Sequence, residues 1–282
     1  MQHERLISNI LYALTLILIV SPFVAFLTGN WITYWKLVTM LGDEQGYVAL
    51  ATLTFILVSP SLGFIMLLSL LSSAWVNVLL KNLLALPRPP PEQWKISAEG
   101  YGFPSGHAQT STAFWSSAYL YVRKNPLAFF GATLVALISL SRVILGVHYP
   151  RDVIGGIVIG LAVSTATYFA SIKLLESKNK TAALTLLSYS LFVAILYFIQ
   201  LDPTLIKTAG VLAGSSLYPL LREKIQLPQS IRYRLFLAGT VLVLALLITY
   251  VSKMLPTVVQ FFSYFLVAVI IIVSPIIRYN FK

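Results

Sequence analysis

The sequence lacks cysteine altogether and contains few charged residues. Without cysteine, disulfide bonds, thiolate catalysis and cysteine-ligated metal sites are excluded. Only 10% of the 282 residues are charged, whereas a soluble domain carries roughly 25%. A water-soluble globular protein is therefore excluded as well, and the apolar residues, 58% of the chain, must face something other than water.

Long continuous apolar runs take the place of the missing charges. The stretches 241–248 and 264–273 show no alternation of apolar and polar residues, so they are typical of membrane helices rather than barrel strands. The sequence predicts an all-α, polytopic transmembrane helical bundle. Ten spans are expected, at residues 7–28, 46–60, 63–86, 105–122, 127–147, 152–172, 182–200, 205–221, 233–252 and 256–277.

Two segments near the N-terminus have distinct patterns. The apolar stretch of the first span is longer than that of a signal peptide, so we interpret it as a retained helix. Residues 31–45 mix Trp31, Tyr34 and Trp35 with polar residues, which favours an amphipathic helix lying at the membrane interface.

The net charge of +11 is explained better by membrane topology than by a nucleic-acid partner, because the basic residues are spread over short loops. Ten spans place both ends of the sequence on one side, and that side carries most of the 20 lysines and arginines. The positive-inside rule then predicts a multi-pass protein of the cell membrane with cytoplasmic termini.

Three polar motifs interrupt the apolar sequence, and all three fall on the predicted extracytoplasmic face. They read Lys81-x6-Arg88-Pro89, Pro104-Ser105-Gly106-His107 and Ser141-Arg142-x5-His148-x3-Asp152. Charged side chains within membrane spans are costly unless they are paired or functional. The motifs therefore mark residues 81–152 as the candidate site.

The first candidates are groups that can hold an anion. Ser105 and Gly106 open a predicted helix, whose free N–H groups and dipole attract phosphate. Lys81, Arg88 and Arg142 supply positive charge, and the planar fork of arginine suits phosphate oxygens. Each motif also has a simpler interpretation, as an ordinary helix start or as cations that extend to the membrane surface.

The second candidates are two of the three histidines. His148 and Asp152 are four residues apart, so a carboxylate in the first turn of a helix can reach back to the imidazole and orient it. His107 lies at the start of another predicted span. Taken alone, Asp152 could simply cap a helix beside an interfacial histidine. The motifs offer no third histidine or second carboxylate, so no metal or other cofactor is expected.

Together the motifs match the three-part signature of the type 2 phosphatidic acid phosphatase superfamily, which the chain resembles over about residues 60–175. The resemblance implies a six-helix core, here residues 1–175, and a metal-independent phosphatase or diphosphatase. Residues 182–282 are then a C-terminal extension of about four transmembrane helices. This extension has a fainter resemblance to sphingosine-1-phosphate phosphatases and related prokaryotic enzymes, and it either packs against lipid or forms a partner surface or groove wall.

The resemblance also implies roles for the motif residues. His148 would attack phosphorus and form a phosphohistidine, Asp152 would orient it, and His107 would protonate the leaving oxygen. The phosphate oxygens would be bound by Lys81, Arg88, Ser105, Gly106 and Arg142. Because one histidine must be neutral and the other protonated, a bell-shaped pH profile is expected.

The sequence thus predicts a membrane lipid phosphatase acting on a phospholipid or polyprenyl phosphate. A polyprenyl diphosphate, cleaved to the monophosphate, suits an extracytoplasmic site best. Phosphatidic acid, phosphatidylglycerol phosphate and sphingoid phosphates fit the same chemistry, as does phosphoryl transfer to a lipid hydroxyl. A transporter or scaffold with a degenerate site is the non-enzymatic alternative. The sequence makes no prediction about oligomeric state.

Overall fold

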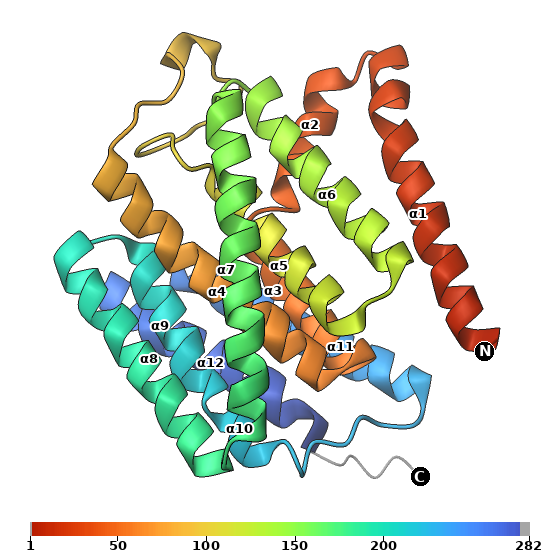
Figure 1. The fold of residues 1–282 in the computed structure, drawn as a ribbon, viewed down its shortest axis with the longest axis vertical. Helices are drawn as coiled ribbons and strands as arrows, with labels where there is room; N and C mark the ends of the chain where they lie inside the picture. Colours follow the sequence, from red (N-terminus) through yellow and green to blue (C-terminus); the bar gives the residue numbers. More distant parts are fainter. Residues whose placement is uncertain (1, 277–282) are drawn as a thin grey trace. The chain divides into compact units, whose positions relative to one another are not determined.

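The structure, a computed structural model, describes residues 2–276, and every regular element in that range is a helix (Figure 1). The α-helices are α1 (Gln2–Leu27), α2 (Trp31–Met40), α3 (Glu44–Leu53), α4 (Pro60–Leu84), α5 (Gly106–Val122), α6 (Asn125–Ile144), α7 (Pro150–Glu176), α8 (Asn179–Gln200), α9 (Pro203–Ser215), α10 (Leu217–Leu221), α11 (Ile231–Ser252) and α12 (Thr257–Val273). A π-helical turn, η1 (Thr54–Val58), and two 3₁₀ turns, η2 (Pro91–Gln93) and η3 (Ser274–Ile276), complete the set.

Seven of these helices are long and apolar enough to cross a membrane, namely α1, α4, α6, α7, α8, α11 and α12. The protein is a multi-pass membrane protein, as the composition predicts. The last residue of the tenth expected span, 277, lies outside the described residues.

Three of the ten expected spans are shorter or interrupted. The span expected at 105–122 is α5, with 17 residues. The span expected at 46–60 is α3 followed by η1, and it ends at Ser59, whose backbone is extended because Pro60 follows it. The span expected at 205–221 is divided between α9 and α10. Pro219 there has no N–H to donate to the preceding turn.

The chain divides into two compact units, Met1–Asp43 with Leu79–Tyr168, and Glu44–Val78 with Phe169–Lys282. All eight candidate site residues belong to the first unit. The expected division into a phosphatase core (1–175) and an extension (182–282) concerns function rather than packing, and it stays a prediction.

In the first unit, α6 packs against α1, α2 and α5, around a buried cluster of Trp35, Val38, Leu137 and Leu145. Helix α7 approaches the backbone of α5 closely, because glycines face it. A Cβ atom on Gly160 would lie only 2.5 Å from the carbonyl oxygen of Gln109. This close approach brings the start of α7 to the start of α5.

In the second unit, α8, α9, α11 and α12 form a separate apolar core together with η1 and α4. Gly210 of α9 lies directly against the backbone of α12 at Phe261. Within this unit, Glu44 pairs with Lys207 at 2.9 Å and accepts a hydrogen bond from Tyr264.

Candidate phosphate-binding and catalytic site

His148 lies in the short loop between α6 and α7 and is 3% exposed. The loop turns at Gly146, where φ is +76° and a Cβ atom would collide with the carbonyl oxygen of Gln93. The imidazole Nδ1 lies 3.3 Å from Oδ2 of the fully buried Asp152, in the first turn of α7, and that oxygen also accepts the backbone N–H of Tyr149 at 3.0 Å. The four-residue spacing therefore forms the histidine–carboxylate pair that it predicts.

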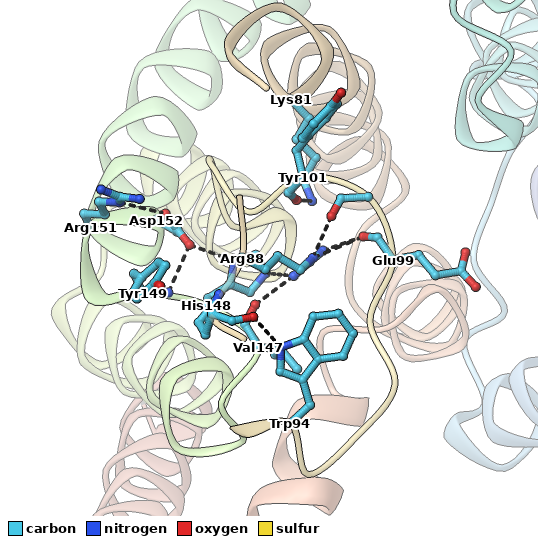
Figure 2. Close-up of polar contacts among 12 residues, drawn as sticks. Lys81, Arg88, Trp94, Glu99, Tyr101, Val147, His148, Tyr149, Arg151 and Asp152 are labelled. Carbon is cyan, nitrogen blue, oxygen red and sulfur yellow. Dashed lines mark hydrogen bonds and ion pairs between the residues drawn. The ribbon is translucent and has the colours of Figure 1, made fainter. Parts of the chain in front are cut away.

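Arg88 contacts the other ring nitrogen of this histidine (Figure 2), and this contact fixes the tautomer. Its Nη1 lies 2.9 Å from Nε2 of His148 and also donates to the carbonyl oxygen of Val147 at 2.9 Å. Arginine can only donate hydrogen bonds, so Nε2 must be the acceptor and carries the lone pair. Nδ1 then carries the proton and donates a hydrogen bond to Asp152.

Backbone carbonyl groups hold the Arg88 side chain in place. Nε donates to the carbonyl of Gly100 at 3.0 Å. Nη2 donates to the carbonyl of Glu99 at 2.8 Å (Figure 2). The loop that supplies these carbonyl groups is tied down by a hydrogen bond from the backbone N–H of Gly102 to the carbonyl of Leu86, at 2.7 Å. The guanidinium is thus preorganised beside the histidine rather than free to move in solvent.

The surroundings keep His148 neutral. Burial lowers its pKa, and the positive charges of Arg88, Arg142 and Lys81 lower it further, while the hydrogen bond to Asp152 opposes them. A neutral imidazole with its lone pair on Nε2 is the form that can act as a nucleophile.

Arg142 and Ser105 carry buried polar atoms that have no hydrogen-bond partner in the described part of the chain. Arg142, near the end of α6, is 7% exposed and donates from Nη1 to Thr39 Oγ1 at 2.7 Å, but its Nε has no acceptor. Ser105 occupies the N-cap position of α5 without capping it, and its buried Oγ is unpartnered. Leaving such a group unsatisfied costs about 1–3 kcal/mol. Both atoms are therefore suited to bind the oxygens of an anion.

The remaining predicted residues lie near these groups. The Ser105 backbone N–H donates to the carbonyl oxygen of Asp152 at 2.9 Å, which joins the starts of α5 and α7, and Gly106 begins α5. Lys81, in the last turn of α4, donates from Nζ to the carbonyl of Tyr101 at 2.9 Å (Figure 2). Within residues 2–276, no cluster of three or more histidine, aspartate or glutamate side chains is arranged to hold a metal ion.

His107, in the first turn of α5, has a partner that the sequence does not predict. Its Nε2 lies 2.9 Å from Oδ1 of Asp43, in the turn between α2 and α3. It makes no described contact with His148, although the charges of Arg142 and Lys81 act on both imidazoles. A second carboxylate, which the three motifs do not contain, therefore serves this histidine from a distant loop.

Asp43 and Thr39 are the two residues that sequence reasoning missed. One signal could have found Asp43. It is one of only nine acidic residues, and it follows the first expected span, in a loop on the same predicted side as the motifs. Thr39 carries no such signal, because a threonine at the end of an aromatic-rich helix is unremarkable in sequence.

Comparison with known proteins identifies the motif-bearing region. Residues 62–175 match the model of the PAP2 superfamily. The chain is 27% identical over 154 residues to a probable sphingosine-1-phosphate phosphatase of Dictyostelium discoideum, covering 48% of this chain and 37% of that protein. It is 36% identical over 91 residues to a decaprenylphosphoryl-5-phosphoribose phosphatase of Mycobacterium tuberculosis, covering 31% and 49%.

These matches cover less than half of each curated relative. Among solved structures, the chain is similar to a transmembrane PAP2-type phosphatidylglycerolphosphate phosphatase of Bacillus subtilis, with a TM-score of 0.44 and 20% identity. That similarity covers 59% of this chain and 96% of the other.

Proposed function

We propose that this chain, which belongs to the PAP2 superfamily through residues 62–175, is an integral membrane lipid phosphatase that works through a phosphohistidine. One observation supports the proposal above the others. Arg88 donates to Nε2 of His148 while Asp152 lies at Nδ1, so the lone pair of a neutral imidazole faces a guanidinium that can bind phosphate.

In the first step, Nε2 of His148 attacks phosphorus, a P–N bond forms, and the P–O bond to the lipid breaks. His107 gives a proton to the departing oxygen, which leaves as a lipid alcohol or as a lipid monophosphate. Asp152 stabilises the positive charge that develops on the attacking imidazole. Arg88, Arg142 and Lys81 stabilise the charge on the equatorial oxygens in place of a metal ion, together with Ser105 and the N–H groups at the start of α5.

In the second step, water attacks the phosphohistidine. His107, now neutral, accepts a proton from that water, the P–N bond breaks and inorganic phosphate leaves. Both histidines then return to their starting protonation states. The opposed requirements on the two imidazoles predict a bell-shaped pH dependence of kcat/KM.

The substrate class is a phosphate or diphosphate on a membrane lipid. The relatives are named for substrates with different tails, a sphingoid base in one and a decaprenyl chain in the other. This supports recognition of the phosphate rather than of a particular tail. We propose a polyprenyl diphosphate as the substrate, because an extracytoplasmic site would meet that lipid, and place phosphatidic acid, phosphatidylglycerol phosphate and sphingoid phosphates behind it.

The test is phosphate release by the purified protein from these four lipids, each with and without EDTA. We expect turnover that EDTA leaves unchanged, fastest with the polyprenyl diphosphate. A ³²P-labelled substrate should leave an acid-labile, base-stable label on the protein, absent in His148→Asn and retained in His3→Asn, which changes the histidine outside the motifs.

Each part of the proposal can fail separately. Loss of turnover in EDTA would overturn the metal-independent mechanism. Labelled phosphate that appears on an added lipid alcohol rather than in water would identify a phosphotransferase. Full activity of His148→Asn in cells would favour a transporter or scaffold.

A further inference from the structure

The end of α2 and the turn after it contact two candidate site residues, although this segment lies outside all three motifs. Thr39 accepts a hydrogen bond from Arg142 at 2.7 Å, and Asp43 lies 2.9 Å from Nε2 of His107. Both contacts bridge long stretches of sequence, of 103 and 64 residues respectively.

Gly42 presses the turn against the His107 ring. A Cβ atom at Gly42 would lie 2.8 Å from Cδ2 of His107 and 3.0 Å from Cγ2 of Ile138, which is closer than van der Waals contact allows. The turn itself is held by backbone hydrogen bonds from Gly42 to Thr39 at 2.9 Å and from Asp43 to Met40 at 3.2 Å. Gly42 therefore lies against one side of the His107 imidazole, and the backbone bonds of the turn hold the Asp43 carboxylate in a defined position.

The charges around His107 make this carboxylate necessary. The groups that act on the ring are Lys81 from α4, Arg142 from α6 and Asp43 from the turn after α2. Burial disfavours a protonated imidazole most, and the charges of Arg142 and Lys81 disfavour it further, yet the proposed reaction needs His107 to carry a proton when the lipid oxygen leaves. The negative charge of Asp43 opposes the cations and favours the protonated ring.

We propose that Asp43 is a positioning residue whose carboxylate accepts a hydrogen bond from Nε2–H of His107, so that the ring stays protonated and transfers its other proton, from Nδ1, to the leaving oxygen. This rests on the proposed function, since it takes His107 as the proton donor. The two imidazoles then use opposite atoms. His148 has Nδ1 bound by its carboxylate and attacks with Nε2, whereas His107 has Nε2 bound and donates from Nδ1.

The pH dependence of kcat/KM for Asp43→Asn tests this assignment. Without the carboxylate, His107 loses its proton at a lower pH, so the alkaline limb should move towards acid by about one pH unit. The acid limb, which reports His148, should stay in place. With a lipid phosphate, whose alkoxide is a poor leaving group, kcat/KM at pH 7 should fall about 10- to 100-fold.

Three further measurements make the result specific. With p-nitrophenyl phosphate, whose leaving group needs no proton, Asp43→Asn should lose less than about 3-fold in kcat/KM. Asp43→Glu should restore most of the lipid phosphatase activity and the position of the alkaline limb. Glu92→Gln, at an exposed acidic residue of the same unit, should match the wild type in both limbs.

The position of a pH limb does not depend on how much of the variant folds, so a poorly expressed Asp43→Asn still gives an answer. An unmoved alkaline limb would overturn the assignment. A rise in kcat/KM with unmoved limbs would also overturn it, and would instead identify Asp43 as a carboxylate that competes with the substrate phosphate. A wild-type protein without phosphate release would overturn the proposed function itself.

Discussion

The two histidine–aspartate pairs of the first unit differ in where their carboxylates come from and in what surrounds them. His148 and Asp152 are four residues apart, and their side chains are 2% and 0% exposed. His107 and Asp43 are 64 residues apart, with side chains 22% and 43% exposed. The first pair is thus built by one helix turn and buried, while the second is assembled by tertiary packing and remains accessible to water.

This difference matches the chemistry proposed for each histidine. A nucleophile must keep a neutral imidazole and a defined tautomer, which burial and Arg88 provide. A proton donor must exchange protons with a leaving group and with water, so a more exposed position suits it. Water also screens the Asp43 charge, so its removal should have a smaller effect than removal of Asp152.

The largest effect should come from the buried pair. Asp152→Asn keeps the shape of the side chain but takes away the charge that, in the proposed mechanism, stabilises the imidazolium of His148. We expect kcat/KM to fall by about 10³- to 10⁴-fold, as it does in other histidine–carboxylate systems. Steady-state kinetics with the preferred lipid phosphate measures this, and a loss smaller than that of Asp43→Asn would reverse the comparison.

Arg88→Gln should have the next largest effect. It should move the acid limb of the pH profile, whereas Asp43→Asn should move the alkaline limb. If Arg88 binds the phosphate as proposed, its loss should lower kcat/KM by about 10²- to 10³-fold. Because the positive charge of Arg88 lowers the pKa of His148, its removal should raise that pKa and shift the acid limb to higher pH. The wild-type acid limb itself should lie below the ordinary histidine value of about 6.5.

The control for this shift is Lys95→Gln, which removes an exposed cation from the same loop. It should leave the acid limb unchanged. If Arg88→Gln also left the limb in place, the neutral state of His148 would have to be attributed to burial alone.

The local pair could be predicted from sequence and the distant pair could not, for a physical reason. A spacing of four residues at a helix start fixes the approach of Asp152 to His148, whatever the rest of the chain does. The approach of Asp43 to His107 depends on how α2 packs against α6 and on the turn at Gly42, and neither is encoded in a local pattern. The contact between Thr39 and Arg142 could not be predicted for the same reason, because it also joins distant segments.

The helices, too, could be predicted where they depend on local properties of the sequence. Continuous apolar runs located the helices of the described region, because length and hydropathy are local properties. The interruptions at Ser59 and near Pro219 were harder to place, since a proline within an apolar run can kink a span, divide it or begin a new helix. The grouping of α3 and most of α4 with the C-terminal helices had no sequence signal, because it follows from packing between distant segments.

Gly42→Ala should have a moderate effect on the His107 side. The added methyl group would overlap the imidazole at 2.8 Å and the Ile138 side chain at 3.0 Å, so the turn or the ring must move. We expect kcat/KM with the lipid phosphate to fall about 10-fold, since small misplacements of reacting groups are costly. Gly239→Ala, at a helical position where no atom of the described residues lies within 4 Å of the new methyl group, should leave activity unchanged and is the matched control.

Thr39→Val should have the smallest effect, and it separates the two contacts made by the end of α2. Valine keeps the shape of threonine but removes the oxygen that accepts from Arg142 at 2.7 Å. Loss of one hydrogen bond to a charged group corresponds to about 1.5–3 kcal/mol, or roughly 10- to 100-fold, when the donor is left unpaired. In the proposed mechanism Arg142 also binds the substrate phosphate, so the loss should be only a few-fold and should appear in KM rather than kcat. A change in the alkaline limb would instead mean that Thr39 helps to hold the turn against His107. The contacts of Arg142 and His107 with the end of α2 would then depend on each other.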